Sequence, residues 1–202
     1  MTTDNLPPKK TGAGLRKIKR ILVIGCGGSG KSTFAVQLAR ATGLKLYHLD
    51  SFYWQPGWNH PPAGQWEGTV EKLIREDEWI IDGSYFGTLE MRLKRAEAVI
   101  LFDLPRMICL WRVFKRRIQN SGGRRLGMPD GCPERIYGSF VKWILRYPEK
   151  SRPLVLEKLN RFSGTVEVFT VKRSGETAQL IDLFRTKNAG LEMDLTPTQA
   201  QL

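Results

Sequence analysis

Short apolar runs alternate along the chain with segments in which apolar residues recur every three or four positions. The runs predict buried strands at residues 21–24, 44–49, 79–81, 98–102 and 166–171. The periodic segments between them predict helices, because this spacing places apolar side chains on one helix face. Alternating strands and helices predict an α/β fold with a five-stranded parallel sheet and helices on both faces.

Several segments lack this pattern. Residues 1–19 contain prolines, glycines and lysines and are expected to form a flexible basic arm. Residues 187–202 are expected to form a flexible tail, which leaves 20–186 as one domain. Residues 51–64 are expected to form a loop, and the glycines and prolines of residues 119–133 predict a small lid.

The most specific motif follows the first predicted strand. Residues 25–32 read Gly-Cys-Gly-Gly-Ser-Gly-Lys-Ser and fit the phosphate-binding pattern G-x-x-x-x-G-K-[ST] between a strand and a helix. Its backbone N–H groups and the helix N-terminus favour an anion, whereas the alternative is a glycine-rich turn without a ligand. Lys31 suits the outer phosphates and Ser32 suits Mg²⁺. The pattern predicts a MgATP site made by Gly25, Gly27, Gly28, Ser29, Gly30, Lys31, Ser32 and Thr33.

Three aspartates follow predicted strands. Because parallel strands end at one edge of a sheet, these carboxylates are expected near the glycine-rich loop. Asp50 is a candidate to orient or deprotonate an acceptor hydroxyl or to hold a metal-bound water, or else it is an N-cap or turn residue. Asp82 and Asp103 are both candidates for Mg²⁺; Asp82 is favoured because Asp103 leads through a proline into a helix.

Arginines form a row after the fourth strand. Arg112 and Arg116 share a helix face, and no acidic residue lies between positions 104 and 129 to pair with them. We therefore favour phosphate contacts over a solvated basic face. Arg124 and Arg125 lie in the predicted lid, and with Arg146 and Arg152 are candidates to stabilise charge on the transferring group.

Aromatic residues cluster after the second and third strands. Tyr53, Trp54, Trp58 and Tyr85 either stack on a ring of the acceptor or form a small accessory core. With Asp50 and Asp82, they make up the predicted acceptor site.

Composition adds charge to this picture. The 202 residues include 32 Lys and Arg but only 20 Asp and Glu, which gives a net charge of +12. This charge favours phosphate-rich partners, which are either nucleotides or nucleic acid. No apolar run approaches the roughly 20 residues that span a bilayer, so no membrane partner is expected. Three scattered cysteines indicate reduced thiols in a cytoplasmic protein.

Two further residue types have alternative interpretations. Cys26 is either an oxidisable thiol with a lowered pKa or a filler of a variable loop position, and the second is favoured. His48 and His60 lack cysteine or acidic clusters at ligand spacing, so no zinc site is expected.

The chain resembles the nucleoside and nucleotide kinases. Residues 102–105, Phe-Asp-Leu-Pro, followed by Arg112 and Arg116, look like the adenylate kinase strand–helix signature. Residues 81–83, Ile-Asp-Gly, are similar to that family's Asp-Gly turn. Residues 49–53, Leu-Asp-Ser-Phe-Tyr, look like the uridine kinase turn. Over roughly residues 20–185, the layout most closely resembles bacterial adenylate kinase-like proteins labelled DNA topology modulation proteins.

This resemblance implies a strand order of 2-3-1-4-5 and a set of roles. Arg112 would pack on the ATP base and Arg116 would reach the phosphates. Asp82 would serve Mg²⁺, and Asp50 would be the base for the acceptor. Adenylate kinases, however, carry Pro-Arg shortly after the Asp-Gly turn to grip AMP, where this chain has Tyr85 and Phe86, so a hydroxyl-bearing acceptor is favoured.

These observations predict a small-molecule kinase that transfers the γ-phosphoryl group of MgATP to a nucleoside-like or other hydroxyl-bearing acceptor. Two alternatives stay open. One is a nucleic-acid-associated ATPase or regulator, suggested by the +12 charge. The other is a nucleotide-binding protein without catalysis.

Overall fold

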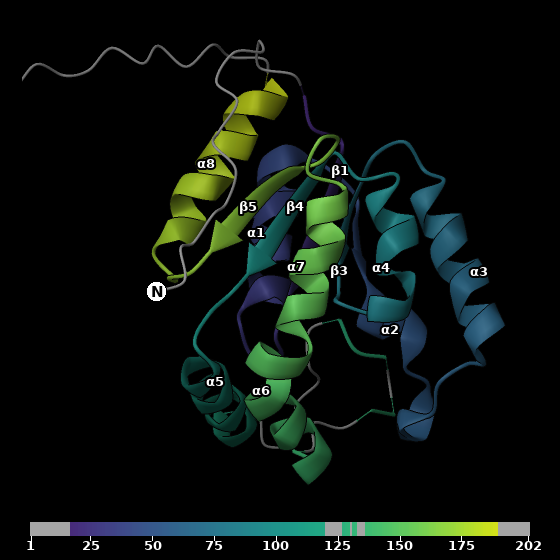
Figure 1. Ribbon diagram of the computed structural model, residues 1–202, viewed down its shortest axis with the longest axis vertical. Helices are drawn as coiled ribbons and strands as arrows, with labels where there is room; N and C mark the ends of the chain where they lie inside the picture. Colours follow the sequence, from purple (N-terminus) through teal and green to yellow (C-terminus); the bar gives the residue numbers. More distant parts are fainter. Residues whose placement is uncertain (1–16, 120–126, 130, 133–135, 190–202) are drawn as a thin grey trace, which may run out of the picture.

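The computed structural model describes residues 17–119, 127–129, 131–132 and 136–189. Five strands of this part form one parallel sheet in the order β2-β3-β1-β4-β5 (Figure 1). The α/β class, the parallel sheet and the strand order are confirmed. The strands are β1 (Arg20–Gly25), β2 (Leu46–His48), β3 (Trp79–Asp82), β4 (Ala98–Phe102) and β5 (Glu167–Val171).

Each face of the sheet is covered by its own helices. Side chains alternate along β1, so that Ile21 and Val23 join one core while Leu22 and Ile24 join the other. The first core includes α1 (Lys31–Thr42) and α8 (Glu176–Ala189). The second includes α3 (Ala63–Ile74), α4 (Phe86–Leu93) and α7 (Arg152–Arg161), and the two layers are visible in Figure 1.

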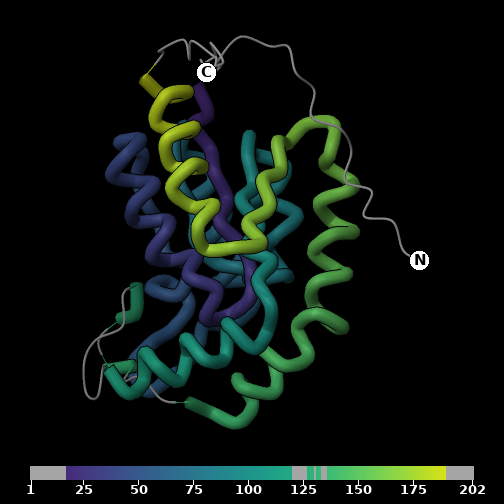
Figure 2. Tube along the Cα trace, turned by 90° about the vertical axis from the view of Figure 1, so that its left-hand side faces the viewer, coloured from purple at the N-terminus to yellow at the C-terminus, as the bar shows by residue number. Residues whose placement is uncertain are grey.

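Two helices lie at the end of the sheet where the strands finish. Helix α5 (Arg106–Gln119) crosses beneath the sheet, and α6 (Gly138–Lys150) packs against it (Figure 2). Both therefore lie at the edge where parallel sheets bind their ligands. No helix within the described ranges is long and apolar enough to cross a membrane.

The prediction of a plain loop at residues 51–64 was wrong. Helix α2 (Leu49–Tyr53) begins directly after β2, which ends at His48 instead of continuing to residue 49. A 3₁₀ turn, η1 (Pro56–Trp58), follows it. Both pieces are too short for a helical period to emerge from the sequence, and the surrounding prolines mask them.

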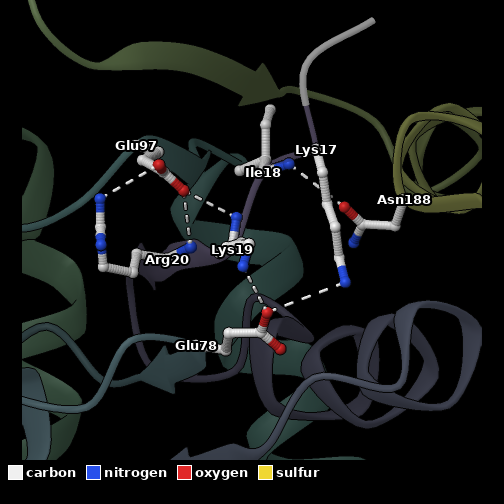
Figure 3. Close-up of polar contacts among 7 residues, drawn as sticks. All are labelled: Lys17, Ile18, Lys19, Arg20, Glu78, Glu97 and Asn188. Carbon is white, nitrogen blue, oxygen red and sulfur yellow. Dashed lines mark hydrogen bonds and ion pairs between the residues drawn. The ribbon is translucent and has the colours of Figure 1, made fainter. Parts of the chain in front are cut away.

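Residues 17–19, predicted to belong to the basic arm, are held where the central strands of the sheet begin (Figure 3). Ile18 is buried, its N–H donates to Asn188 Oδ1 at 3.2 Å, and the Lys19 N–H donates to Glu97 Oε2 at 2.7 Å. Lys17 and Lys19 both pair with Glu78. Asn188 belongs to α8, which continues to residue 189, so the tail begins later than predicted. The rest of the arm and of the tail lies outside the described residues.

Candidate active site

The glycine-rich loop joins β1 to α1 and is held from two sides. The Ser84 hydroxyl donates to Gly25 O at 2.7 Å and accepts from Gly25 N–H at 3.0 Å. On the other side, α5 packs so closely that a Cβ on Gly28 would lie 2.3 Å from the Cys109 carbonyl oxygen. Gly28 also has φ of 78°, a conformation that suits glycine. The loop is therefore preformed by its contacts.

Arg112 connects three elements around this loop. Its Nη1 donates to Ser29 O at 2.9 Å, and its Nη2 donates to Ser174 Oγ, which precedes α8. A cavity of about 410 Å³ opens here. Its lining includes Gly28, Ser29, Gly30, Lys31, Ser32 and Thr33 from the loop and α1, with Arg112 and Arg116 from α5.

A second cavity, of about 710 Å³, also has Lys31 in its lining. Aromatic side chains dominate its walls, and Asp50 and Asp82 provide its carboxylates. Lys31 and Arg116 line both cavities. The two spaces therefore meet at a pair of cations. The aromatic lining residues are Trp54, Trp58, Tyr85, Phe86, Tyr137, Phe140 and Trp143.

Asp82 ends β3 and is buried with one carboxylate oxygen uncommitted. His48 Nδ1 lies 2.8 Å from Oδ2, whereas Oδ1 is buried and has no hydrogen-bond partner within the described residues. Burial by itself would raise the pKa of Asp82, but the hydrogen bond with His48, the Lys31 charge and the nearby Ser32 hydroxyl outweigh it and lower the pKa. The carboxylate is consequently ionised at neutral pH.

Asp82 and Ser32 together fit the way in which nucleotide-binding enzymes bind Mg²⁺. The orphaned Oδ1 and the Ser32 hydroxyl are hard oxygen ligands. No group of three His, Cys, Asp or Glu in the described chain forms a metal site of its own. A magnesium ion here would therefore need phosphate oxygens and water to complete its shell, as is usual for Mg²⁺ with nucleotides.

Asp50 lies in the first turn of α2 and is oriented by Tyr85, whose hydroxyl donates to Asp50 Oδ1 at 2.7 Å. Tyr85 in turn belongs to a turn that Arg92 holds from beneath. Arg92 is fully buried and donates to the carbonyls of Gly83, Ser84 and Tyr85 at 2.7–2.9 Å. Burial lowers the pKa of this guanidinium.

Sequence reasoning missed both Arg92 and His48. The available signal for Arg92 was an arginine on the apolar face of a short helix, between Leu89 and Leu93. His48 was considered only as a zinc ligand, and nothing in its spacing pointed to a partner 34 residues away.

Several predicted site residues do not reach the cavities. Arg146 is exposed on α6 and lines neither of them. Arg152 also lines neither; its Nη2 pairs with Asp103 Oδ2 at 2.8 Å, and Asp103 likewise lines neither cavity. Tyr53 packs against Trp66 and Tyr85, with ring centroids 5.0 and 4.8 Å away, as an accessory core would.

The predicted lid is described only in part, and Arg124 and Arg125 lie outside the described residues. The described pieces contact the second cavity: Met128 and Cys132 are buried and line it. Cys132 Sγ donates to Gln55 O, and Gly131 O accepts from Gly57 N–H at 3.0 Å. This segment thus packs on the turn after α2, on the side of the aromatic cavity.

Cys26 does not have the features of an activated thiol. It is buried, and a hydrogen bond with Cys109 together with burial raises the pKa of its thiol. These features fit the alternative in which Cys26 only fills a variable position of the loop.

Comparison with known proteins supports the fold. No family model matches the chain, and no curated protein does. Among solved structures, a shikimate kinase from Acinetobacter baumannii in complex with shikimate aligns with a TM-score of 0.56 at 15% identity, covering 85% of this chain and 93% of that one. A sugar kinase from Janibacter sp. gives 0.52 at 19% identity, covering 87% and 99%. A gluconokinase from Sinorhizobium meliloti gives 0.51 at 18%, covering 86% and 93%. The chain therefore shares the fold of these kinases.

Proposed function

We propose that the chain is an ATP-dependent small-molecule kinase, which transfers the γ-phosphoryl group of MgATP to a nucleoside-like or other hydroxyl-bearing acceptor. One observation carries the proposal: Lys31 and Arg116 line both cavities. Phosphoryl transfer needs donor and acceptor in line, with positive charge on the group that moves between them. Two cavities that meet at two cations meet this requirement. The kinase fold of the structural neighbours supports the same reaction class.

The first cavity is the proposed donor site. The loop N–H groups and Lys31 would bind the phosphates, and Arg112 would lie along the nucleotide, since it already lines this cavity. Ser32 and Asp82 would hold Mg²⁺, which when bound neutralises charge on the β- and γ-phosphates. Arg116 and Lys31 would stabilise the charge that develops on the transferring group.

The second cavity is the proposed acceptor site. The acceptor oxygen attacks the γ-phosphorus, its proton passes to Asp50, and the bond to the β-phosphate oxygen breaks to release ADP. The hydroxyl of Tyr85 holds Asp50 in place for this step. Among the described lining residues, the cations are Lys31 and Arg116, both shared with the donor side. An acceptor phosphate would compete for them, so we propose an acceptor without one, stacked on the aromatic walls.

We also propose that the chain lies in the adenylate kinase-like branch that includes DNA topology modulation proteins, because residues 49–58 and 79–85 carry that pattern. A cytoplasmic location is proposed, since Cys26, Cys109 and Cys132 are free thiols. The net charge of +12 keeps the nucleic-acid-associated ATPase as the second candidate.

The test is a panel of nucleosides, nucleotides and sugars, assayed for ATP-dependent ADP release and for phosphorylated product by mass spectrometry. Lys31→Ala should abolish turnover, and Asp50→Asn should abolish it while ADP still binds. ATP binding without turnover on any acceptor would count against the proposal. Duplex DNA at low salt belongs in the same assay: an ATPase rate that rises with DNA and falls steeply with salt would favour the second candidate.

A further inference from the structure

His48 and Asp82 are paired by the sheet itself. His48 ends β2, Asp82 ends β3, and the parallel register places the two residues side by side. Nδ1 of the imidazole consequently lies 2.8 Å from Asp82 Oδ2, and the two side chains are only 15% and 5% exposed. A contact this buried and this short is a fixed feature of the site, because neither side chain has room to move into solvent.

The direction of this hydrogen bond follows from the chemistry of its two partners. A carboxylate oxygen only accepts hydrogen bonds, so Nδ1 of His48 is the donor in this contact of 2.8 Å. Oδ2 is committed to His48, whereas Oδ1 stays buried and without a partner among the described residues. His48 thereby decides which oxygen of Asp82 is available to the metal.

The His48 side chain is also approached by the segment after α5. Gly127 has φ of 75°, and a Cβ added there would lie 2.7 Å from His48 Cγ and 2.9 Å from its Cβ. Only glycine lets the backbone pass this close to the ring. The next residue, Met128, is buried and lines the second cavity. The His48 side chain therefore contacts both Asp82 and a segment that lines the second cavity.

We propose that His48 is a positioning residue for the magnesium site: it holds Asp82 so that Oδ1 points to the metal, and Gly127 holds its ring in place. This role rests on the proposed function, because it assumes a nucleotide-bound magnesium at Ser32 and Asp82. Partners that orient a metal ligand typically change metal affinity by about 10- to 100-fold when they are removed.

Manganese affinity tests this role without an acceptor. Mn²⁺ is titrated into the full chain with and without ADP, and free Mn²⁺ is followed by its paramagnetic resonance signal. His48→Phe keeps a ring but removes the donor, whereas His48→Asn keeps a donor near the Nδ1 position. His60→Asn is the matched control, because the other histidine has no contact with Asp82. Thermal unfolding checks each variant, and His48→Gln, whose amide reaches toward the Nε2 position, replaces His48→Phe if that variant does not fold.

We expect His48→Phe to weaken Mn²⁺ binding to the ADP complex by about tenfold or more while metal-free ADP affinity is unchanged. His48→Asn should retain most of the affinity, and Gly127→Ala should weaken it because the added Cβ displaces the ring. Wild-type Mn²⁺ affinity in His48→Phe would overturn the role of His48 and leave the proposed function standing. A wild-type chain that binds neither ADP nor ATP would instead overturn the proposed function, and the role of His48 with it.

Discussion

Arg92 offers the sharpest test of how the site is built. The guanidinium is fully buried in α4 and donates to the carbonyls of Gly83, Ser84 and Tyr85. Tyr85 O also accepts from Thr88 N–H, but within the described chain no other hydrogen bond is made to the carbonyls of Gly83 and Ser84. Arg92→Met keeps an unbranched apolar side chain and leaves the buried Gly83 carbonyl and the partly buried Ser84 carbonyl without a donor.

The expected loss of stability follows from those two groups. A buried polar group without a partner costs about 1–3 kcal/mol, so two carbonyls set an upper range of about 2–6 kcal/mol, which the partial exposure of Ser84 reduces. Burying a guanidinium is itself costly, and its removal offsets part of this loss. We therefore expect the free energy of unfolding to fall by about 3 kcal/mol.

Urea denaturation followed by tryptophan fluorescence measures this change. The matched control is Arg95→Met, just beyond the same helix, where an exposed arginine makes one bond to Ile74 O and little change is expected. The same turn carries Ser84, which holds Gly25, so Arg92→Met should also weaken ADP binding. A loss below about 1 kcal/mol would refute the reasoning, because the two carbonyls would then have found other partners.

The remaining predictions concern the two cavities and the loop. Tyr85→Phe should lower kcat by about tenfold or more with ATP affinity unchanged, because Asp50 loses a charge-assisted hydrogen bond. Steady-state kinetics on the acceptor that the panel identifies measure this change, and an unchanged kcat would contradict the prediction. Because the folded pKa of Asp82 is lowered, its contribution to stability is complete above the ordinary carboxyl pKa of about 3.9 and is lost as pH falls through the folded value. Denaturation at several acid pH values should therefore show a shallower loss of stability for Asp82→Asn than for the wild type, and parallel curves would argue against a lowered pKa. Gly28→Ala should abolish ADP binding measured by calorimetry, since its Cβ would lie 2.3 Å from a carbonyl of α5, whereas Gly64→Ala, with nothing within 4 Å, should bind ADP normally. Retained ADP binding in Gly28→Ala would mean that the loop can move away from α5.

The sequence was a good guide wherever a pattern is local. The apolar runs located β1, β3 and β4 because a strand buried on both faces needs consecutive apolar residues. They also located the two outer strands, β2 and β5, although most residues of these strands are only partly buried. The glycine-rich motif located its loop because backbone conformation there depends on glycines close together in sequence. Short elements such as α2 escaped prediction, since five residues do not complete two helical turns.

The sequence predicted many of the residues of the candidate site, but not which of them contact one another. Sequence reasoning placed Asp82 ahead of Asp103 for the metal, and the ion pair of Asp103 with Arg152 is consistent with that preference. It also assigned Arg146 and Arg152 to the transferring phosphate, although neither lines a cavity. An arginine row shows where positive charge occurs along the chain, but the partner of each guanidinium depends on which helices pack together.

The sequence by itself determined the α/β fold, the glycine-rich loop and the carboxylates at the strand ends, because each of these depends on neighbouring residues. Only the tertiary structure decided that Lys31 and Arg116 stand between two cavities, that Tyr85 orients Asp50, and that His48 holds Asp82. The residues of these three pairs lie 34 to 85 positions apart in the sequence. Their geometry is set by strand register and helix packing, to which the whole chain contributes.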